Sequence, residues 1–374
     1  MCAGVAGQRG RRVLLLDHAE AAGKKILISG GGRCNFTNVH TAPDRYLSAN
    51  PHFMKSALRR YTAQDFIDLV DSHRIAWHEK TLGQLFCDGS ARQIVHMLME
   101  ECAKGAARIS LGRPITDVSH ADGVFRVRYG DEEASAPALV IATGGPSIPK
   151  MGATGFAYDL ARQFGLKVVE PRPALVPLTL GGDETLFRSL SGVATEVVAR
   201  TGKTQFREAA LFTHKGLSGP AILQISSYWR HGEQIGIDFL PSRVRDWAVE
   251  AKRARPRTHF HTILSEALPG RLAEALAKRI GIWGELANVP DRKLDEVGRQ
   301  LADWRFSPNG TEGFAKAEVT AGGISTAGLS SQTMEAKDVP GLFAIGEAVD
   351  VTGWLGGYNF QWAWASGWAA GQAL

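Results

Sequence analysis

The chain has 374 residues, of which 44% are hydrophobic, and this composition can bury the cores of two or three domains. Its net charge of +5 is a small excess, typical of a solvated surface, and gives little support to a nucleic-acid partner. Four scattered cysteines without a C-x-x-C pair argue against a zinc knuckle or an adjacent redox dithiol. With no signal peptide, they favour a cytoplasmic location.

The N-terminal residues predict the end of a helix followed by a strand. Residues 1–10 are small, and the apolar run 13–16 predicts a buried strand that ends at Asp17. An acidic residue at such a strand tip is where a dinucleotide-binding fold hydrogen-bonds a ribose hydroxyl. The strand and G-x-G-x-x-G loop expected about 20 residues earlier do not precede it. We therefore expect either a start codon assigned too late or a truncated chain.

Residues 23–38, GKKILISGGGRCNFTN, predict a ligand-binding loop. Three consecutive glycines allow the backbone to approach a flat or phosphorylated ligand closely. Basic and hydrogen-bonding side chains surround them, which favours ligand binding over a plain surface turn. Cys34 is either a redox thiol or a small structural cysteine in a tight loop, since no partner cysteine is near it in the sequence.

The next segment predicts two amphipathic helices, over 63–73 and 90–104. Short β runs follow at 108–111, 115–119 and 124–129, and they suggest a small antiparallel meander. Residues 138–145 then predict another buried strand ending in glycines, as expected where a flavin or dinucleotide domain returns to its parallel sheet. The histidines in this segment have no metal-ligand spacing, and we expect no metal site.

Three prolines, Pro171, Pro173 and Pro177, predict a break in regular structure and a domain boundary. Residues 178–240 are β-rich. Within them, residues 213–220 predict a turn that opens a helix, with Pro220 in its first turn. A nucleophile elbow needs glycine where Pro220 stands, so that motif is excluded.

Residues 243–306 are helical and locally basic. A solvated helical face explains this composition better than an RNA-binding surface, although both remain open. The basic residues at its start are Arg243, Arg245, Lys252, Arg253, Arg255 and Arg257.

The C-terminal segment predicts a strand at 341–345, an acidic turn, a double glycine and a helix over 360–373. Such a helix start offers unpaired N–H groups and a partial positive charge to an anionic group. Residues 351–374 carry no charge, but the glycines within them make a buried terminal helix a better interpretation than a membrane span. The tryptophans of this helix are then core residues.

These elements predict an α/β fold in which the two ends of the chain form one nucleotide-binding domain. We expect its two parts at 1–177 and 307–374, an inserted β-rich domain at 178–242, and a helical subdomain of that insert at 243–306.

Five motifs together resemble the YhiN/BaiN/RdsA-type flavoproteins, also called the aminoacetone oxidase family of FAD-binding enzymes. They are GKKILISGGGRCNFTN, GQLFCDGSARQIV, ATGGPSIPKMGATGFAYDLARQFG, FTHKGLSGPAILQIS and GLFAIGEAVDVTGWLGGYNFQWAWASGWAAG, and they extend over nearly the whole chain. The resemblance implies a glutathione-reductase-like, Rossmann-type FAD domain, here without its first strand. It also implies tightly bound FAD and an inserted β-barrel-like domain that carries the helical subdomain.

Carried over by motif, the resemblance implies a set of FAD-binding residues. Asp17 would meet the adenosine ribose, Ile115 the adenine, and the helix start after Gly356 the pyrimidine edge of the flavin. The full set is Asp17, Lys25, Ser29, Gly30, Gly31, Gly32, Arg33, Cys34, Asn35, Asn38, Ile115, Thr143, Gly144, Gly346, Glu347, Asp350, Gly356, Gly357, Tyr358, Asn359 and Gln361.

The function expected from the sequence is a two-electron oxidoreductase, with hydride transfer between flavin N5 and a small organic substrate. His214, Lys215 and Cys34 are candidates for the substrate-side chemistry. A flavin-dependent tRNA-modifying enzyme and a truncated, non-catalytic relic are the alternatives. No second dinucleotide fingerprint supports NADPH binding. The sequence names neither the substrate nor the oligomeric state.

Overall fold

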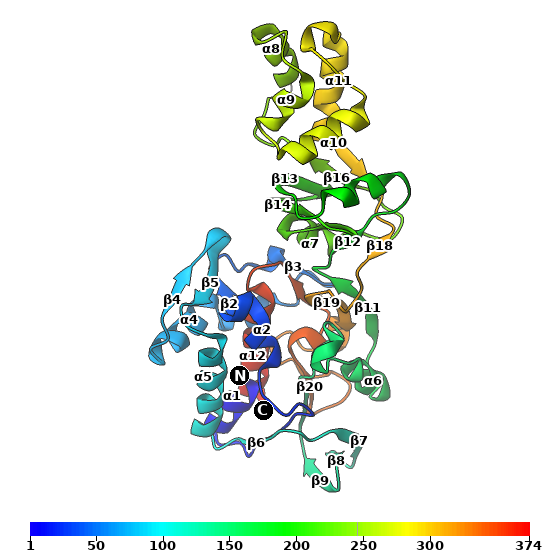
Figure 1. Cartoon of the computed structure of the whole chain (residues 1–374). Helices are drawn as coiled ribbons and strands as arrows, with labels where there is room; N and C mark the ends of the chain where they lie inside the picture. Colours follow the sequence, from blue (N-terminus) through cyan, green and yellow to red (C-terminus); the bar gives the residue numbers. More distant parts are fainter. Residues whose placement is uncertain (245) are drawn as a thin grey trace. The chain divides into compact units, whose positions relative to one another are not determined.

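The computed structural model describes residues 1–244 and 246–374, so Arg245 lies outside the described residues (Figure 1). The chain divides into two compact units. Met1–Arg172 and Val319–Leu374 form the first, which we call the discontinuous unit. Pro173–Glu318 forms the second, which we call the inserted unit.

Two pairs of parallel strands belong to the discontinuous unit. β1 (Leu14–Leu16) pairs with β6 (Arg108–Ser110), and β10 (Leu139–Ile141) pairs with β20 (Leu342–Ala344). The second pair joins the two parts of the discontinuous unit in one sheet. Parallel strands present their carboxyl ends at the same edge, which is where ligands bind in this class of fold.

Helices from both ends of the chain pack together in this unit (Figure 1). α1 (Cys2–Gln8) packs against α5 (Ala91–Lys104) and α12 (Tyr358–Ala373). Small residues allow the close approach, since a Cβ on Gly7 would lie 2.4 Å from the carbonyl oxygen of Gly105. The other helices of the unit are α2 (Lys24–Ile28), α3 (Lys55–Arg60), α4 (Ala63–Ser72) and α6 (Phe156–Gln163).

The terminal helix α12 is a core element, as expected. The Trp364 ring stacks on Phe66 with ring centroids 4.6 Å apart, and its Nε1 donates to the Phe36 carbonyl at 2.8 Å. Trp362 is buried and donates to the carbonyl of Gly346. Within residues 1–244 and 246–374, no helix combines the length and the apolarity that crossing a bilayer requires.

The antiparallel meander differs in its strands from the expectation. It comprises β7 (Ile115–Ala121), β8 (Val124–Tyr129) and β9 (Glu132–Ala136). The expected first run, 108–111, instead forms β6 and pairs in parallel with β1. β6 is only three residues long, which is too short for its sequence to indicate its partner. β9 is mostly exposed, so its sequence lacks the apolar alternation that is typical of a half-buried strand.

The sequence predicts that regular structure is broken at Pro171, Pro173 and Pro177, and the structure differs at the first two. β11 (Val168–Ala174) runs through Pro171 and Pro173. Its sheet has two strands, β11 and β19 (Val319–Ile324), so every strand in it is an edge strand, where the missing proline N–H is tolerated. The remaining strands of the discontinuous unit are β2 (Asn35–Asn38), β3 (Tyr46–Leu47), β4 (Trp77–Glu79), β5 (Gln84–Cys87) and β21 (Thr352–Gly353).

The inserted unit is built on a seven-stranded sheet with the order β17-β16-β13-β14-β15-β12-β18. α7 (Pro220–Ser226) begins with Pro220 at its first position, as the sequence predicts. The strands are β12 (Leu178–Thr179), β13 (Ala194–Thr201), β14 (Thr204–Phe212), β15 (Gly216–Ser218), β16 (Ile235–Asp238), β17 (Trp304–Phe306) and β18 (Gly310–Thr311).

Four helices are inserted between β16 and β17, and we call them the helical part (Figure 1). α8 packs against α11, and α9 packs against α10. Their apolar faces are buried and their charged faces exposed, which is the pattern of amphipathic surface helices. The helices are α8 (Trp247–Ala254), α9 (Phe260–Ser265), α10 (Gly270–Ile280) and α11 (Asp291–Ala302).

Candidate functional site

The triple glycine forms a left-handed turn directly after α2. Gly30, Gly31 and Gly32 have φ angles of 58°, 67° and 86°, which only glycine adopts without strain. No atom lies within 4 Å of the position that a Cβ on Gly31 would take. For Gly32 the nearest atom, the Leu27 carbonyl oxygen, is 3.9 Å away. The turn therefore has an open side on which its backbone can meet a ligand.

A charged network joins α2 to the turn after β20. Lys25 Nζ lies 2.5 Å from Glu347 Oε2 and donates to Ser147 Oγ at 2.8 Å. Ser147 donates to the other carboxylate oxygen at 2.8 Å, and the Thr320 N–H donates to the same oxygen at 2.9 Å. One carboxylate thus orders a lysine, a hydroxyl and a backbone amide from three other segments of the chain.

Unpartnered polar atoms lie beside this network. Tyr158 OH and Thr320 Oγ1 are buried and have no hydrogen-bond partner among the described residues. Both lie within 2.8 Å of the Cβ position of Gly145, so they converge on one place. Burial, with the nearby Glu347 and Asp350 carboxylates, raises the pKa of Tyr158, which therefore keeps its proton to donate. Buried polar atoms without partners require an explanation, and a bound polar ligand is one.

These features fit FAD. A ligand with phosphate groups matches the glycines with an open side and the lysine held at the edge of the glycine turn. Its hydrogen-bonding groups match the unpartnered hydroxyls. Gly144 and Gly346 add two further positive-φ glycines, with φ of 70° and 63°. No atom lies within 4 Å of a Cβ position on Gly144, and for Gly346 the nearest atom is the Ala363 Cβ at 3.9 Å.

The double glycine before α12 packs against protein. A Cβ on Gly357 would lie 2.4 Å from the Thr37 carbonyl oxygen, and one on Gly356 would lie 2.9 Å from the Gln84 side chain. Asn38 Nδ2 donates to the Gly356 carbonyl at 2.8 Å. The structure thus brings the expected residues of 35–38 and 356–361 together, with the glycines allowing the contact.

Several expected FAD-binding side chains of this region already have protein partners. Gln361 is buried between Thr37, which donates to its Oε1 at 2.6 Å, and the Tyr61 carbonyl, to which its Nε2 donates at 3.1 Å. Asn359 bonds the backbone of Gly353 in both directions, and the Tyr358 carbonyl accepts from the hydroxyl of Tyr46. Their direct role in the structure is to fix the start of α12.

Other expected residues lie at separate places in the discontinuous unit. Asp17 follows β1, and its Oδ1 accepts from the Ala19 N–H at 2.8 Å. Ile115 begins β7, and Thr143 follows β10. Asp350 is buried, accepts from the Ala49 N–H, and has a pKa raised by burial.

Cys34 is a buried thiol next to the glycine turn, and Arg33 before it is exposed. Burial raises the pKa of Cys34 to about 12, against the opposing effect of a hydrogen bond with Ser29. The side chain is therefore a neutral thiol at physiological pH, which weakens it as a nucleophile. Ser29 Oγ donates to the Ile26 carbonyl at 2.7 Å.

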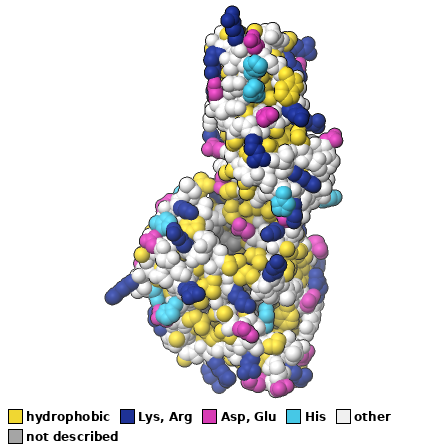
Figure 2. Space-filling view, viewed as in Figure 1, with side chains coloured by type: hydrophobic (Ala, Val, Ile, Leu, Met, Phe, Trp, Pro, Cys, Tyr) yellow, Lys and Arg dark blue, Asp and Glu magenta, His cyan; other side chains and the backbone are white. Residues whose placement is uncertain are grey.

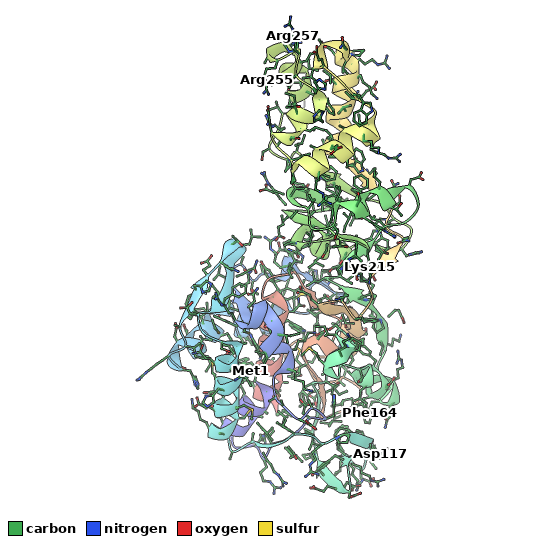
Figure 3. All side chains as sticks on the ribbon, viewed as in Figure 1. Met1, Asp117, Phe164, Lys215, Arg255 and Arg257 are labelled. Carbon is green, nitrogen blue, oxygen red and sulfur yellow. The ribbon has the colours of Figure 1, made fainter. Side chains whose placement is uncertain are left out.

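His214 and Lys215 lie together in a pocket of about 550 Å³ in the inserted unit. Lys215, labelled in Figure 3, pairs with Glu312, whose side chain is only 9% exposed, at 3.0 Å. His214 and Lys316 also line the pocket, and neither side chain forms a hydrogen bond or ion pair among the described residues. The other lining residues are Pro177, Ser191, Gly192, Leu211, Phe212, Thr213 and Ser218.

The sequence did not single out some residues of these two places. Ser147, Tyr158 and Thr320 adjoin glycine-rich segments that it did identify, but nothing in the sequence shows which hydroxyl is buried. Glu312 lies far from Lys215 in the chain, and only folding makes it a partner. Within the described residues, no group of three or more His, Cys, Asp or Glu side chains is placed to hold a metal ion.

The chain matches curated proteins over its full length. It is 51% identical to the "Ribosomal RNA dihydrouridine synthase" of Escherichia coli, with 100% of this chain and 94% of that protein covered. It is 45% identical to the protein of the same name from Haemophilus influenzae, with 100% and 95% covered. It is 28% identical to the "3-dehydro-bile acid delta(4,6)-reductase" of Clostridium scindens, with 97% and 92% covered.

A family model described as "HI0933-like protein Rossmann domain" matches residues 1–373. This match confirms the Rossmann-type fold and the flavoprotein family that the motifs resemble, and the relatives named as enzymes confirm the expectation of an enzyme. The chain therefore belongs to the HI0933-like family of Rossmann-domain flavoproteins, and it is an FAD-dependent enzyme of the oxidoreductase type.

Proposed function

We propose that this protein is a ribosomal RNA dihydrouridine synthase, which reduces the C5–C6 double bond of a uridine base in ribosomal RNA. The observation that carries the proposal is the 51% identity, over the whole chain, to an E. coli protein of that name. The sequence alone favoured a small organic substrate over nucleic acid, because the net charge of +5 is modest. The names of the relatives from Escherichia coli and Haemophilus influenzae favour ribosomal RNA as the substrate instead.

The reaction adds one hydride and one proton to the base. Reduced FAD supplies the hydride. We assign its pyrophosphate to the glycine turn and Lys25, because the turn has an open side and the lysine is held by Glu347 at 2.5 Å. The unpartnered hydroxyls of Tyr158 and Thr320 would complete the binding of its polar groups.

We assign the substrate-side chemistry to the pocket of the inserted unit. His214 is the proposed proton donor, since an imidazole can carry and release a proton near neutral pH and this one has no protein partner in the described chain. Lys215, held by Glu312, and Lys316 supply positive charge for a phosphate of the RNA. Cys34 is the weakest of the three original candidates, because it is buried.

The test uses the purified protein with its flavin chemically reduced, which removes any dependence on the natural electron donor. Ribosomal RNA transcribed in vitro is incubated with it and digested to nucleosides. Mass spectrometry should find a nucleoside heavier than uridine by two hydrogens. Its absence, with the flavin present and reduced, would contradict the proposal.

The bile-acid reductase relative supports a second candidate, the reduction of a conjugated carbon–carbon double bond in a small unsaturated ketone. At 28% identity this support is weaker than that from the RNA enzymes. Oxidation of the reduced flavin by such a ketone, with no reaction on RNA, would favour it.

A further inference from the structure

The helical part of the inserted unit carries an exposed aromatic and basic patch. Its members are Arg257, His259, His261 and Trp283, and all four are exposed. Trp283 is 62% exposed, although most other tryptophans of the chain are packed against neighbours. A single exposed apolar side chain is common on protein surfaces, so the interest of Trp283 lies in the basic and aromatic side chains that share its surface.

The backbone brings the segment of the two histidines beside the segment of Trp283, with Arg257 further along the same pair of segments. The segment of Arg257 to Phe260 runs antiparallel to the segment that follows Trp283, with a bridge between His259 and Glu285. The Phe260 N–H donates to the Gly284 carbonyl at 3.3 Å, and the Leu286 N–H donates to the Thr258 carbonyl at 2.9 Å. Trp283 immediately precedes Gly284, so its backbone lies beside the segment that carries His259 and His261. The His259 and His261 rings are 5.7 Å apart.

The charge around the patch is positive. Residues 243–257 contain six arginines and lysines against two acidic residues, one of the six being Arg245, which is not described. Arg255 is neutralised by a two-pronged pair with Glu266, and Lys252 pairs with Asp291. Arg253 and Arg257 form no ion pair among the described residues. Figure 3 labels Arg255 and Arg257 on the helical part, and Figure 2 shows neighbouring histidines and basic side chains there.

We propose that this patch binds unpaired nucleotides of the ribosomal RNA substrate, with a base stacked on Trp283 and the backbone phosphates on Arg257 and Arg253. This inference rests on the proposed function and names the surface that would recognise its substrate. Exposed aromatic rings beside cations are the arrangement that binds single-stranded nucleic acid, because every base has a face to stack. Two of the acidic side chains nearby, Glu266 and Asp291, are paired with Arg255 and Lys252 and add little negative charge to the patch.

The experiment measures binding of in-vitro-transcribed ribosomal RNA fragments to the full-length flavoprotein at several salt concentrations. Trp283→Ala should raise Kd by about fivefold or more, since stacking of one base is worth about 1–3 kcal/mol. Trp283→Phe should restore most of the affinity. Arg257→Gln should weaken binding. It should also reduce the slope of log Kd against log salt concentration by about one, as expected for the loss of one phosphate contact.

Two matched variants serve as controls. Leu82→Ala removes another exposed apolar side chain, 58% exposed, in the discontinuous unit. Arg292→Gln removes an arginine whose side chain is 90% exposed on α11. Both should bind RNA as the unmodified protein does.

The outcomes separate this inference from the proposed function. RNA that is reduced and bound equally well by the unmodified protein and by Trp283→Ala would overturn the inference and leave the function standing. RNA bound in a Trp283-dependent manner but never reduced would support the surface and contradict the function. Equal weakening by Trp283→Ala and Leu82→Ala would also overturn the inference, because the effect would then not belong to this patch.

Discussion

Lys25 and Glu347 are 322 positions apart in the chain, and their side chains meet at 2.5 Å. Lys25 lies in α2, just before the glycine turn, and Glu347 follows the last strand, β20. The pair therefore fastens the N-terminal glycine turn to the C-terminal part of the parallel sheet. The same carboxylate also accepts from Ser147 and the Thr320 amide, so a single side chain organises the proposed FAD site.

The first prediction concerns Glu347→Gln. Loss of the charge should release Lys25 and raise the Kd for FAD by about tenfold, because hydrogen bonds to charged groups contribute about 1.5–3 kcal/mol. Titration of the apoprotein with FAD, followed by flavin fluorescence, measures the change. Glu196→Gln breaks a surface pair with Arg207 in the inserted unit and should leave FAD affinity unchanged. Equal affinity in both variants would show that the network does not hold the cofactor.

The second prediction concerns the open side of the glycine turn. Gly31→Ala places a methyl group where FAD is proposed to lie, at a φ of 67°, and should lower both stability and FAD content. Gly165 has a φ of 77° and equally open surroundings, but it follows α6, away from the turn in sequence. Gly165→Ala should therefore cost a similar stability, about 1–2 kcal/mol, and retain FAD. A loss of FAD in both variants would indicate strain alone.

The fold was predictable where a segment carries a strong local pattern. α4 and α5 begin with capping boxes at Thr62 and Ser90, and α12 is long and apolar, so their positions follow from the sequence. The path of β6 was not predictable. Its pairing with β1 depends on contacts between residues nearly 100 positions apart. The three-residue sequence of β6 does not indicate which strand it will pair with.

The candidate site was predictable in its glycines and less so in its polar partners. Three consecutive positive φ angles strongly favour glycine, so Gly30 to Gly32 are visible in the sequence. The burial of Thr320 and Tyr158 depends on how β19 and α6 pack, which no local pattern specifies. For Gln361 the sequence predicts a ligand contact, because it is a polar residue near a helix start. In the structure its side chain is instead hydrogen-bonded to Thr37 and to the Tyr61 carbonyl.

The third prediction is a pH dependence of stability at Glu101. Desolvation alone would raise the pKa of this carboxyl, but hydrogen bonds from Lys104, Gln8 and His73 outweigh it and lower the pKa to about 2. A lowered pKa stabilises the fold above the ordinary value of 4.5, and this contribution is lost as the pH falls from 4.5 toward 2.

Glu101→Gln should therefore lower the free energy of unfolding at pH 7 by about 1–2 kcal/mol, and the difference should shrink below the ordinary carboxyl pKa. Urea unfolding at a series of pH values measures this. Asp159→Asn, at a side chain 74% exposed, should have little effect at any pH. A Glu101→Gln difference that stays constant down to pH 3 would point to lost packing instead of lost charge.

The fourth prediction concerns the proposed proton donor. His214→Gln should lower kcat by about 10²–10⁴-fold, the usual contribution of general acid catalysis, because the base would receive its hydride without a proton. FAD content should not change, since His214 lies in the pocket of the inserted unit and FAD is assigned to the discontinuous unit. Single-turnover oxidation of the reduced flavin by ribosomal RNA measures the step directly.

His231→Gln is the matched control, because His231 is also exposed in the inserted unit but does not line the pocket. Its turnover should equal that of the unmodified protein. Lys215→Met should instead raise KM more than it lowers kcat, because Lys215 is assigned to the RNA phosphate and is held in place by Glu312. If His214→Gln changed KM alone, the histidine would be a binding group, and the proton would have to come from another residue or from water.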